Sequence, residues 1–168
     1  MKPPICLCPV CKKHPIQQRC LQLRSTCPPR PPKPGPLAGI HAQLINTTSA
    51  LLADGQNVIF DTVLNQLGTA ISYDKATGVF TVAKAGSYLV VWSASVDGSD
   101  ILPHIRLALT LDGKAVAAPP TPISVGVISG SALVTAAPGA KLALANNTTD
   151  IIRLGETPPA ANIVISAI

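Results

Sequence analysis

Aromatic residues are scarce in this chain. Its 168 residues include two Phe, two Tyr and one Trp, and all five lie between Phe60 and Trp92. Seven of the thirteen Lys and Arg residues lie in residues 1–41, where there is no ring on which a nucleic-acid base could stack. The excess of basic residues is therefore not expected to bind nucleic acid. Nonspecific attraction of these cations to an acidic surface or a glycan is the favoured alternative.

Charge is scarce in the rest of the chain. Residues 42–168 hold six basic and eight acidic residues, fewer than half of the roughly 25% charged residues of a typical soluble domain. A single domain of this size leaves roughly a third of its unfolded-chain surface exposed to water. We therefore expect copies of the chain to bury part of their apolar surface against one another. A monomer with a surface rich in Ser, Thr and Ala is the alternative.

Long apolar runs are absent as well. No run approaches the roughly 18 apolar residues of a membrane span, so none is expected. The segment "MKPPICLCPVCKKH" also lacks the unbroken apolar core of a secretory signal, because Pro and Cys interrupt it. All five Cys nevertheless lie within the first 27 residues. Because cytosolic chains seldom keep disulfides, these thiols suggest metal binding, or oxidation outside the reducing compartment.

The cysteines allow three interpretations. Three Cys and one His within nine positions could hold Zn²⁺ tetrahedrally, but paired C-x2-C units are absent and Pro9 stiffens the loop. Intermolecular disulfide cross-linking is favoured, because five is an odd number and an extended arm leaves thiols exposed. Unpaired thiols are the third interpretation. The weak metal candidates are Cys6, Cys8, Cys11 and His14, and the cross-linking candidates are Cys6, Cys8, Cys11, Cys20 and Cys27.

The proline content and the composition predict that the chain has two parts. Residues 1–39 read as a basic, disordered, non-globular Cys/Pro-rich arm, in which "CPPRPPKPGPLAG" (residues 27–39) is expected to be an extended polyproline II stalk. Residues 40–168 read as a single head domain.

No stretch after residue 39 has helical periodicity, and short alternating runs are bounded by turn residues. Asp112-Gly113 has the composition of a two-residue hairpin turn. The last run is apolar on both faces, so it is expected inside a sheet and not at a wet edge. Eight to ten short antiparallel strands without helices predict an all-β sandwich or jelly roll. The expected strands and hairpins are 40–45, 58–60, 70–82, 87–96, 104–116, 122–136, 140–147 and 162–168.

The aromatic residues are expected in the core. Tyr73 and Phe80 pair across the 70–82 hairpin, and Tyr88 and Trp92 share one face of the next strand. Each buried ring removes about 150–250 Å² from water. One cluster of these four rings is therefore predicted to join the two sheets.

The aromatic spacing resembles the signature of the complement component 1q head, within the tumour necrosis factor superfamily of jelly rolls, although that signature prefers an aromatic at position 90. A closer resemblance is to bacterial members, above all the C-terminal head of the collagen-like exosporium glycoprotein of Bacillus. It is carried by residues 60–92, 109–116 and 162–168, and it covers about residues 40–168. The residues that match the signature are Tyr73, Phe80, Gly86, Tyr88 and Trp92.

The resemblance implies a jelly roll of about ten strands that forms a tight homotrimer, with the C-terminal strand near the threefold axis. It implies a non-enzymatic structural protein of the spore outer layer (exosporium or coat), made in the mother-cell cytosol. The N-terminal cysteines would then cross-link the head to other spore-layer or surface proteins. The alternative is an extracellular trimeric adhesive head of a secreted or phage-type fibre that binds a receptor, a glycan or a host surface. The short arm of this chain replaces a long collagen stalk, so no role that needs collagen is implied.

Catalytic chemistry has little support in the sequence. The segment "DGSDILPHIR" gathers two acids, one His and one Arg, which could hold Ca²⁺ or act on a substrate, but a solvated loop is favoured. No nucleophile is placed beside a base, and no Gly-rich phosphate loop occurs. We therefore expect no catalytic residue and no cofactor. The residues of the gathered segment are Asp97, Asp100, His104 and Arg106.

Overall fold

The computed structural model describes residues 37–46, 51–99, 104–118 and 125–168. Residues Pro36–Ile168 form one compact unit. Within the described ranges there are twelve strands. They are β1 (Gly39–Leu44), β2 (Leu51–Leu52), β3 (Thr62–Leu67), β4 (Ile71–Asp74), β5 (Val79–Val82), β6 (Gly86–Ser99), β7 (Leu107–Leu111), β8 (Lys114–Ala117), β9 (Gly126–Ala136), β10 (Lys141–Asn146), β11 (Ile152–Leu154) and β12 (Ala161–Ala167).

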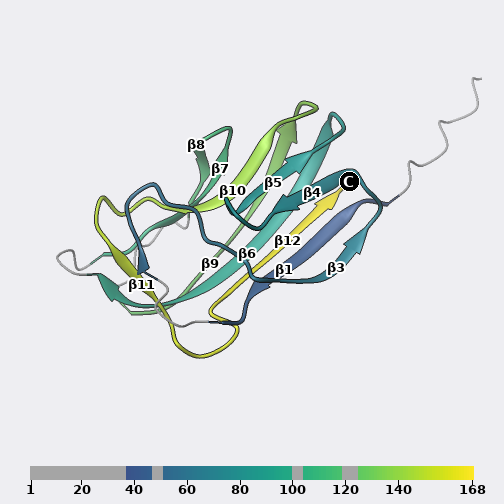
Figure 1. The fold of residues 1–168 in the computed structure, drawn as a ribbon. Coiled ribbons are helices and arrows are strands. Elements are labelled where there is room, and N and C mark those ends of the chain that lie inside the picture. Colours follow the sequence, from purple (N-terminus) through teal and green to yellow (C-terminus); the bar gives the residue numbers. More distant parts are fainter. Residues whose placement is uncertain (1–36, 47–50, 100–103, 119–124) are drawn as a thin grey trace, which may run out of the picture. The chain divides into compact units, whose positions relative to one another are not determined.

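The strands form two antiparallel sheets (Figure 1). One has the order β2-β11-β6-β12-β1-β3, with β9 paired along β6, and the other has the order β4-β5-β10-β7-β8. No helix occurs in the described residues. The predicted all-β, antiparallel jelly-roll sandwich is therefore confirmed. The last strand, β12, lies between β6 and β1, as its apolar character on both faces predicted.

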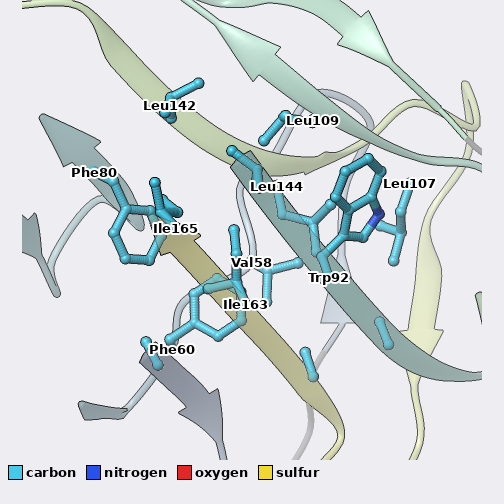
Figure 2. Close-up of a cluster of buried hydrophobic side chains, with 14 of the residues drawn as sticks. Val58, Phe60, Phe80, Trp92, Leu107, Leu109, Leu142, Leu144, Ile163 and Ile165 are labelled. Atoms are coloured by element: carbon cyan, nitrogen blue, oxygen red, sulfur yellow. The ribbon is translucent and has the colours of Figure 1, made fainter. Parts of the chain in front are cut away.

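Alternation along each strand places the core between the sheets. On β6, Tyr88, Val90, Trp92, Ala94 and Val96 are all buried, and the residues between them face outward. From the facing sheet, Leu107 and Leu109 of β7 and Leu142 and Leu144 of β10 point into the same interior (Figure 2). Burial of these side chains is the main favourable contribution to folding.

Three of the five rings form a contact cluster. The rings of Tyr73 and Phe80 stack with centroids 4.4 Å apart, and Phe60 lies 5.8 Å from Phe80. The hydroxyl of Tyr73 accepts a hydrogen bond from the Phe60 amide (2.7 Å) and donates one to the Phe60 carbonyl (3.0 Å). Tyr73 therefore ties the segment before β3 to the β4–β5 hairpin.

Tyr88 and Trp92 are buried but make no ring contact with this cluster. The four rings that were predicted to join the sheets do belong to one hydrophobic core, with Tyr73 packed against it, but Tyr88 and Trp92 do not touch the other rings. The physical reason is that both residues lie on β6 in the other sheet, where Tyr88 donates its hydroxyl to the Lys84 carbonyl (2.7 Å). Trp92 lies directly opposite Gly130 of β9, and its Nε1 has no hydrogen-bond partner within the described residues.

The prediction of a strand at residues 58–60 is wrong. This segment is not a strand, although Val58 donates its amide to the Leu144 carbonyl (2.8 Å) beside β10. The strand that follows, β3, was not expected, because its residues are almost all exposed and give no apolar alternation. Pairing with β1 supplies the order that the local sequence lacks.

The Cys/Pro-rich arm and its cysteines lie outside the described residues, apart from positions 37–39. The expected division at residue 40 stays a prediction.

Candidate assembly face

The seven-stranded sheet has an outward side whose central part carries no Asp, Glu, Lys or Arg. Asp97 near the end of β6 and Arg153 of β11 lie beyond this part on the same sheet. We call this central part the uncharged face and define it by residues that alternate with buried ones on β1, on β12, on residues 89–95 of β6 and on residues 127–133 of β9, together with their partners on β3. Its members are Gly39, His41, Gln43, Asn65, Leu67, Leu89, Val91, Ser93, Ser95, Val127, Ser129, Ser131, Leu133, Asn162, Val164 and Ser166.

Strand register arranges these residues in continuous rows. One row runs across five strands as Leu133, Leu89, Ser166, Gly39 and Leu67. The next row runs as Ser131, Val91, Val164, His41 and Asn65. The rows join side chains that are far apart in the sequence, and they form one surface because sheet neighbours on the same side lie about 5 Å apart.

Large apolar side chains on this face meet water in the single chain. Leu133 and Val127 are both 67% exposed, and Leu89 and Val91 are both 42% exposed. Charged residues lie outside this face: Asp97 and Arg153 lie at one end of the same sheet, and others, such as Asp74 and Lys141, lie on the five-stranded sheet. Contiguous exposed apolar surface of this kind marks an interaction site in soluble proteins. The uncharged face is therefore the best candidate surface for association.

A small polar cluster lies inside the uncharged face. The Asn162 Oδ1 atom lies 2.6 Å from His41 Nε2 and accepts a hydrogen bond from Gln43 Nε2 (3.1 Å). Because an amide oxygen can only accept, His41 Nε2 is the donor. A shallow hollow of about 90 Å³ adjoins His41 and is lined by uncharged residues, among them Asn65, Leu67 and Val164.

A second hollow, of about 410 Å³, lies beside the ends of β1 and β2. Its floor includes Leu44, Leu52 and Leu154, and Asp61 and Lys75 lie at its edge. Asp61 accepts hydrogen bonds from the Ile45 amide (3.1 Å), the Asn46 amide (2.6 Å) and the Thr62 hydroxyl (2.8 Å).

The carboxylate of Asp61 is held in its ionised form. Burial acts to raise its pKa, but these hydrogen bonds outweigh burial and, with the positive charge of Lys75, hold the pKa below its ordinary value. A carboxylate with occupied oxygens and a lowered pKa is poorly suited to act as a general base. Its geometry indicates that it ties the residues just after β1 to the segment before β3.

The predicted chemical residues are not assembled into a site. Asp97, His104 and Arg106 are exposed, and Asp100 lies outside the described residues. Within the described ranges, no three His, Cys, Asp or Glu side chains come close enough to hold a metal ion. The cysteines and His14 lie outside those ranges, so their cross-linking or metal roles stay predictions. In the same described part of the chain, no helix has the length and apolarity to cross a membrane.

Sequence reasoning missed two polar groups. The first is His41 with Asn162, whose contact spans 121 positions and has no local signal. The second is Asn146, which is 1% exposed and donates its amide to the carbonyls of Leu52 (2.9 Å) and Asp150 (2.7 Å). Its Oδ1 accepts the Thr148 amide (2.9 Å), so Asn146 holds the loop after β10 against β2.

Comparison with known proteins gives a likeness of fold. No model of a known protein family matches the chain, and no curated protein matches its sequence. Among solved structures, Eiger TNF of S. frugiperda superposes with a TM-score of 0.60 at 15% identity, covering 80% of this chain and 94% of that one. The globular domain of zebrafish complement 1qA gives 0.52 at 20% identity, covering 80% and 96%. Murine APRIL at pH 8.5 gives 0.56 at 10% identity, covering 79% and 99%.

The described domain therefore has the jelly-roll fold of the tumour necrosis factor and complement 1q heads. This confirms the fold that the resemblance implied.

Proposed function

We propose that this protein is a non-enzymatic structural head that assembles as a homotrimer through its uncharged face. The observation that carries the proposal is that face: two rows of residues, mostly Leu, Val and Ser, cross five strands without one Asp, Glu, Lys or Arg. Such a surface is poorly suited to water and well suited to a second copy of itself. Burial between copies would also account for the few charges in residues 42–168.

The number of copies rests on the resemblance in sequence, which implies a trimer with its C-terminal strand near the threefold axis. The position of β12 supports this arrangement, because β12 lies between β6 and β1 near the middle of the uncharged face. Three identical heads at fixed geometry would bind a repeated surface with higher avidity than one head.

The test is the mass of the full chain in solution under reducing conditions, measured by light scattering. We expect about three chains per particle. Val91→Asp places a charge in the middle of the uncharged face and should give single chains. Val116→Asp makes the same change on β8 of the other sheet, at a side chain of similar exposure (47% against 42%), and should leave the wild-type mass unchanged. A wild-type particle of one chain at micromolar concentration would refute the proposal.

The placement of the head is a further part of the proposal. The head is displayed on the spore outer layer, and the N-terminal cysteines anchor it there by intermolecular disulfides. The support is the resemblance to the exosporium glycoprotein together with five thiols in the first 27 residues. Non-reducing electrophoresis should show a ladder of cross-linked species, and replacement of all five Cys by Ser should abolish it. A ladder that survives this replacement would exclude anchoring by disulfides.

A further inference from the structure

One titratable side chain, His41, stands on the uncharged face. It lies on β1 between Val164 of β12 and Asn65 of β3, so strands flank it on both sides. The ring is partly buried in the single chain. A histidine that is already half covered loses its remaining water when another surface packs on the sheet.

The hydrogen bond to Asn162 fixes which ring nitrogen can change its protonation. Asn162 Oδ1 engages His41 Nε2 at 2.6 Å and can only accept, so the neutral ring carries its proton on Nε2. The other nitrogen, Nδ1, is then the atom that takes up a proton in acid. In the neutral ring Nδ1 is an acceptor, whereas in the charged ring it is a donor.

Among the described residues, no opposite charge faces the ring from the strands on either side of it. From β12 the neighbours on the same side are Asn162, Val164 and Ser166, and from β3 they are Asn65 and Leu67. None of these is an acid or a base. Asp61, just before β3, is held by the amides of Ile45 and Asn46 beyond the end of β1.

We propose that His41 makes the assembly acid-sensitive, so that protonation of its imidazole separates the copies of the chain. The proposal rests on the proposed function, because it needs the uncharged face to be buried between copies. Three charged rings would then be buried in one assembly with no carboxylate beside them from the described residues of their own chains, and burial disfavours a charge that has no partner. Histidine is the side chain that most readily changes its charge between neutral and mildly acidic pH, so the transition is expected in that range.

The direction of the pH effect on association follows from proton linkage. On this proposal the separated chains bind protons at His41 and the assembly does not, so association weakens as the pH falls. Release of three protons per trimer makes the association constant fall by up to about a thousandfold per pH unit. The chain concentration at half-assembly should therefore rise by up to about thirtyfold per pH unit, since it varies as the inverse square root of that constant.

The experiment measures mass against chain concentration at pH 7.5 and pH 5.5, with the full chain in reducing buffer. The wild type should be assembled at pH 7.5, and its half-assembly concentration should rise at least tenfold at pH 5.5. His41→Gln keeps a donor for Asn162 but cannot be charged, so this concentration should change less than twofold. His104→Gln removes an exposed histidine outside the uncharged face and should behave like the wild type. Circular dichroism checks that each variant keeps its β-structure.

The outcomes separate the two proposals. Single wild-type chains at pH 7.5 would overturn the proposed function and this inference with it. An assembly that is equally stable at both pH values, or a folded H41Q variant as acid-sensitive as the wild type, would overturn the inference alone. If H41Q does not fold, the slope of the wild-type association constant against pH decides. A fall in the logarithm of that constant of one or more per pH unit between pH 7.5 and 5.5 supports the inference, and a smaller fall overturns it.

Discussion

Replacement of Gly130 by Ala should destabilise the protein although it adds only one methyl group. Gly130 lies opposite Trp92 in the β6–β9 pair, and a Cβ atom there would stand 2.7 Å from Trp92 Cε2 and 2.9 Å from Cη2. Carbon atoms in contact are normally about 3.5–4.0 Å apart. Trp92 is 1% exposed, so its rigid ring has no open side to move into. The glycine is therefore required for space.

The magnitude follows from two opposing effects. Overpacking of a buried site costs about 1–3 kcal/mol. Replacing Gly by Ala also makes the unfolded chain less flexible, which stabilises the folded state by about 0.5–1 kcal/mol and offsets part of that cost. We expect G130A to lower the free energy of unfolding by about 1–2 kcal/mol, which shifts the urea midpoint down by about 0.5–1 M at a typical slope.

The matched control is Gly86→Ala on β6, where the nearest atom to a new Cβ is Tyr88 Cε2 at 3.9 Å. This variant should be as stable as the wild type, or more stable by up to about 1 kcal/mol. The assay is urea denaturation at one chain concentration, followed by fluorescence of the single Trp and by circular dichroism. In a Trp92→Leu background, G130A should cost less, because the ring it meets is gone. Wild-type stability of G130A, or an equal loss in both glycine variants, would refute the steric argument.

Three further predictions concern polar groups. Burial raises the pKa of Tyr73 to about 12. The stability that this group contributes below about pH 10 should therefore be lost as the pH rises toward 12. In urea denaturation curves measured over that pH range, Tyr73→Phe should lose less stability than the wild type. Hydrogen bonds from the Ile45 and Asn46 amides and the Thr62 hydroxyl outweigh burial and lower the pKa of Asp61. The stability that this carboxylate contributes is therefore present above about pH 4 and lost below it. In acid denaturation, Asp61→Asn should lose less stability than the wild type as the pH falls. Asn146→Ala removes the donor to the Leu52 carbonyl in a buried hydrogen bond and to the Asp150 carbonyl in a partly buried one, and it should cost about 2–4 kcal/mol. Ala at the exposed Asn147 should change stability by less than about 0.5 kcal/mol; equal urea midpoints would contradict this.

Local patterns predicted much of the fold. The 70–82 hairpin, the long strand through Trp92 and the Asp112-Gly113 turn were all expected, because alternation and turn residues act over a few positions. Asp112 and Gly113 have φ values of 50° and 78°, as a primed two-residue turn requires. The prediction was wrong where local pattern gave no guide, at residues 58–60 and in the exposed strand β3.

The uncharged face likewise combines a property that the sequence predicted with properties that it could not predict. The low charge of residues 42–168 indicated that copies associate, but composition could not say which surface they use. The rows of the uncharged face come from strand pairs such as β1 with β12, whose members are more than a hundred positions apart. The polar cluster at His41 could not be predicted for the same reason, since Asn162 lies near the other end of the chain.

The sequence by itself determined that this domain is all-β, apolar inside, poor in charge and preceded by a cysteine-rich arm. Those properties depend on composition and on a period of two, which near neighbours in the chain define. Only the tertiary structure decided which rings touch, where the uncharged face lies and which histidine stands on it. Antiparallel pairing between distant strands sets these, because register assigns every side chain to one side of a sheet and to one row on that side.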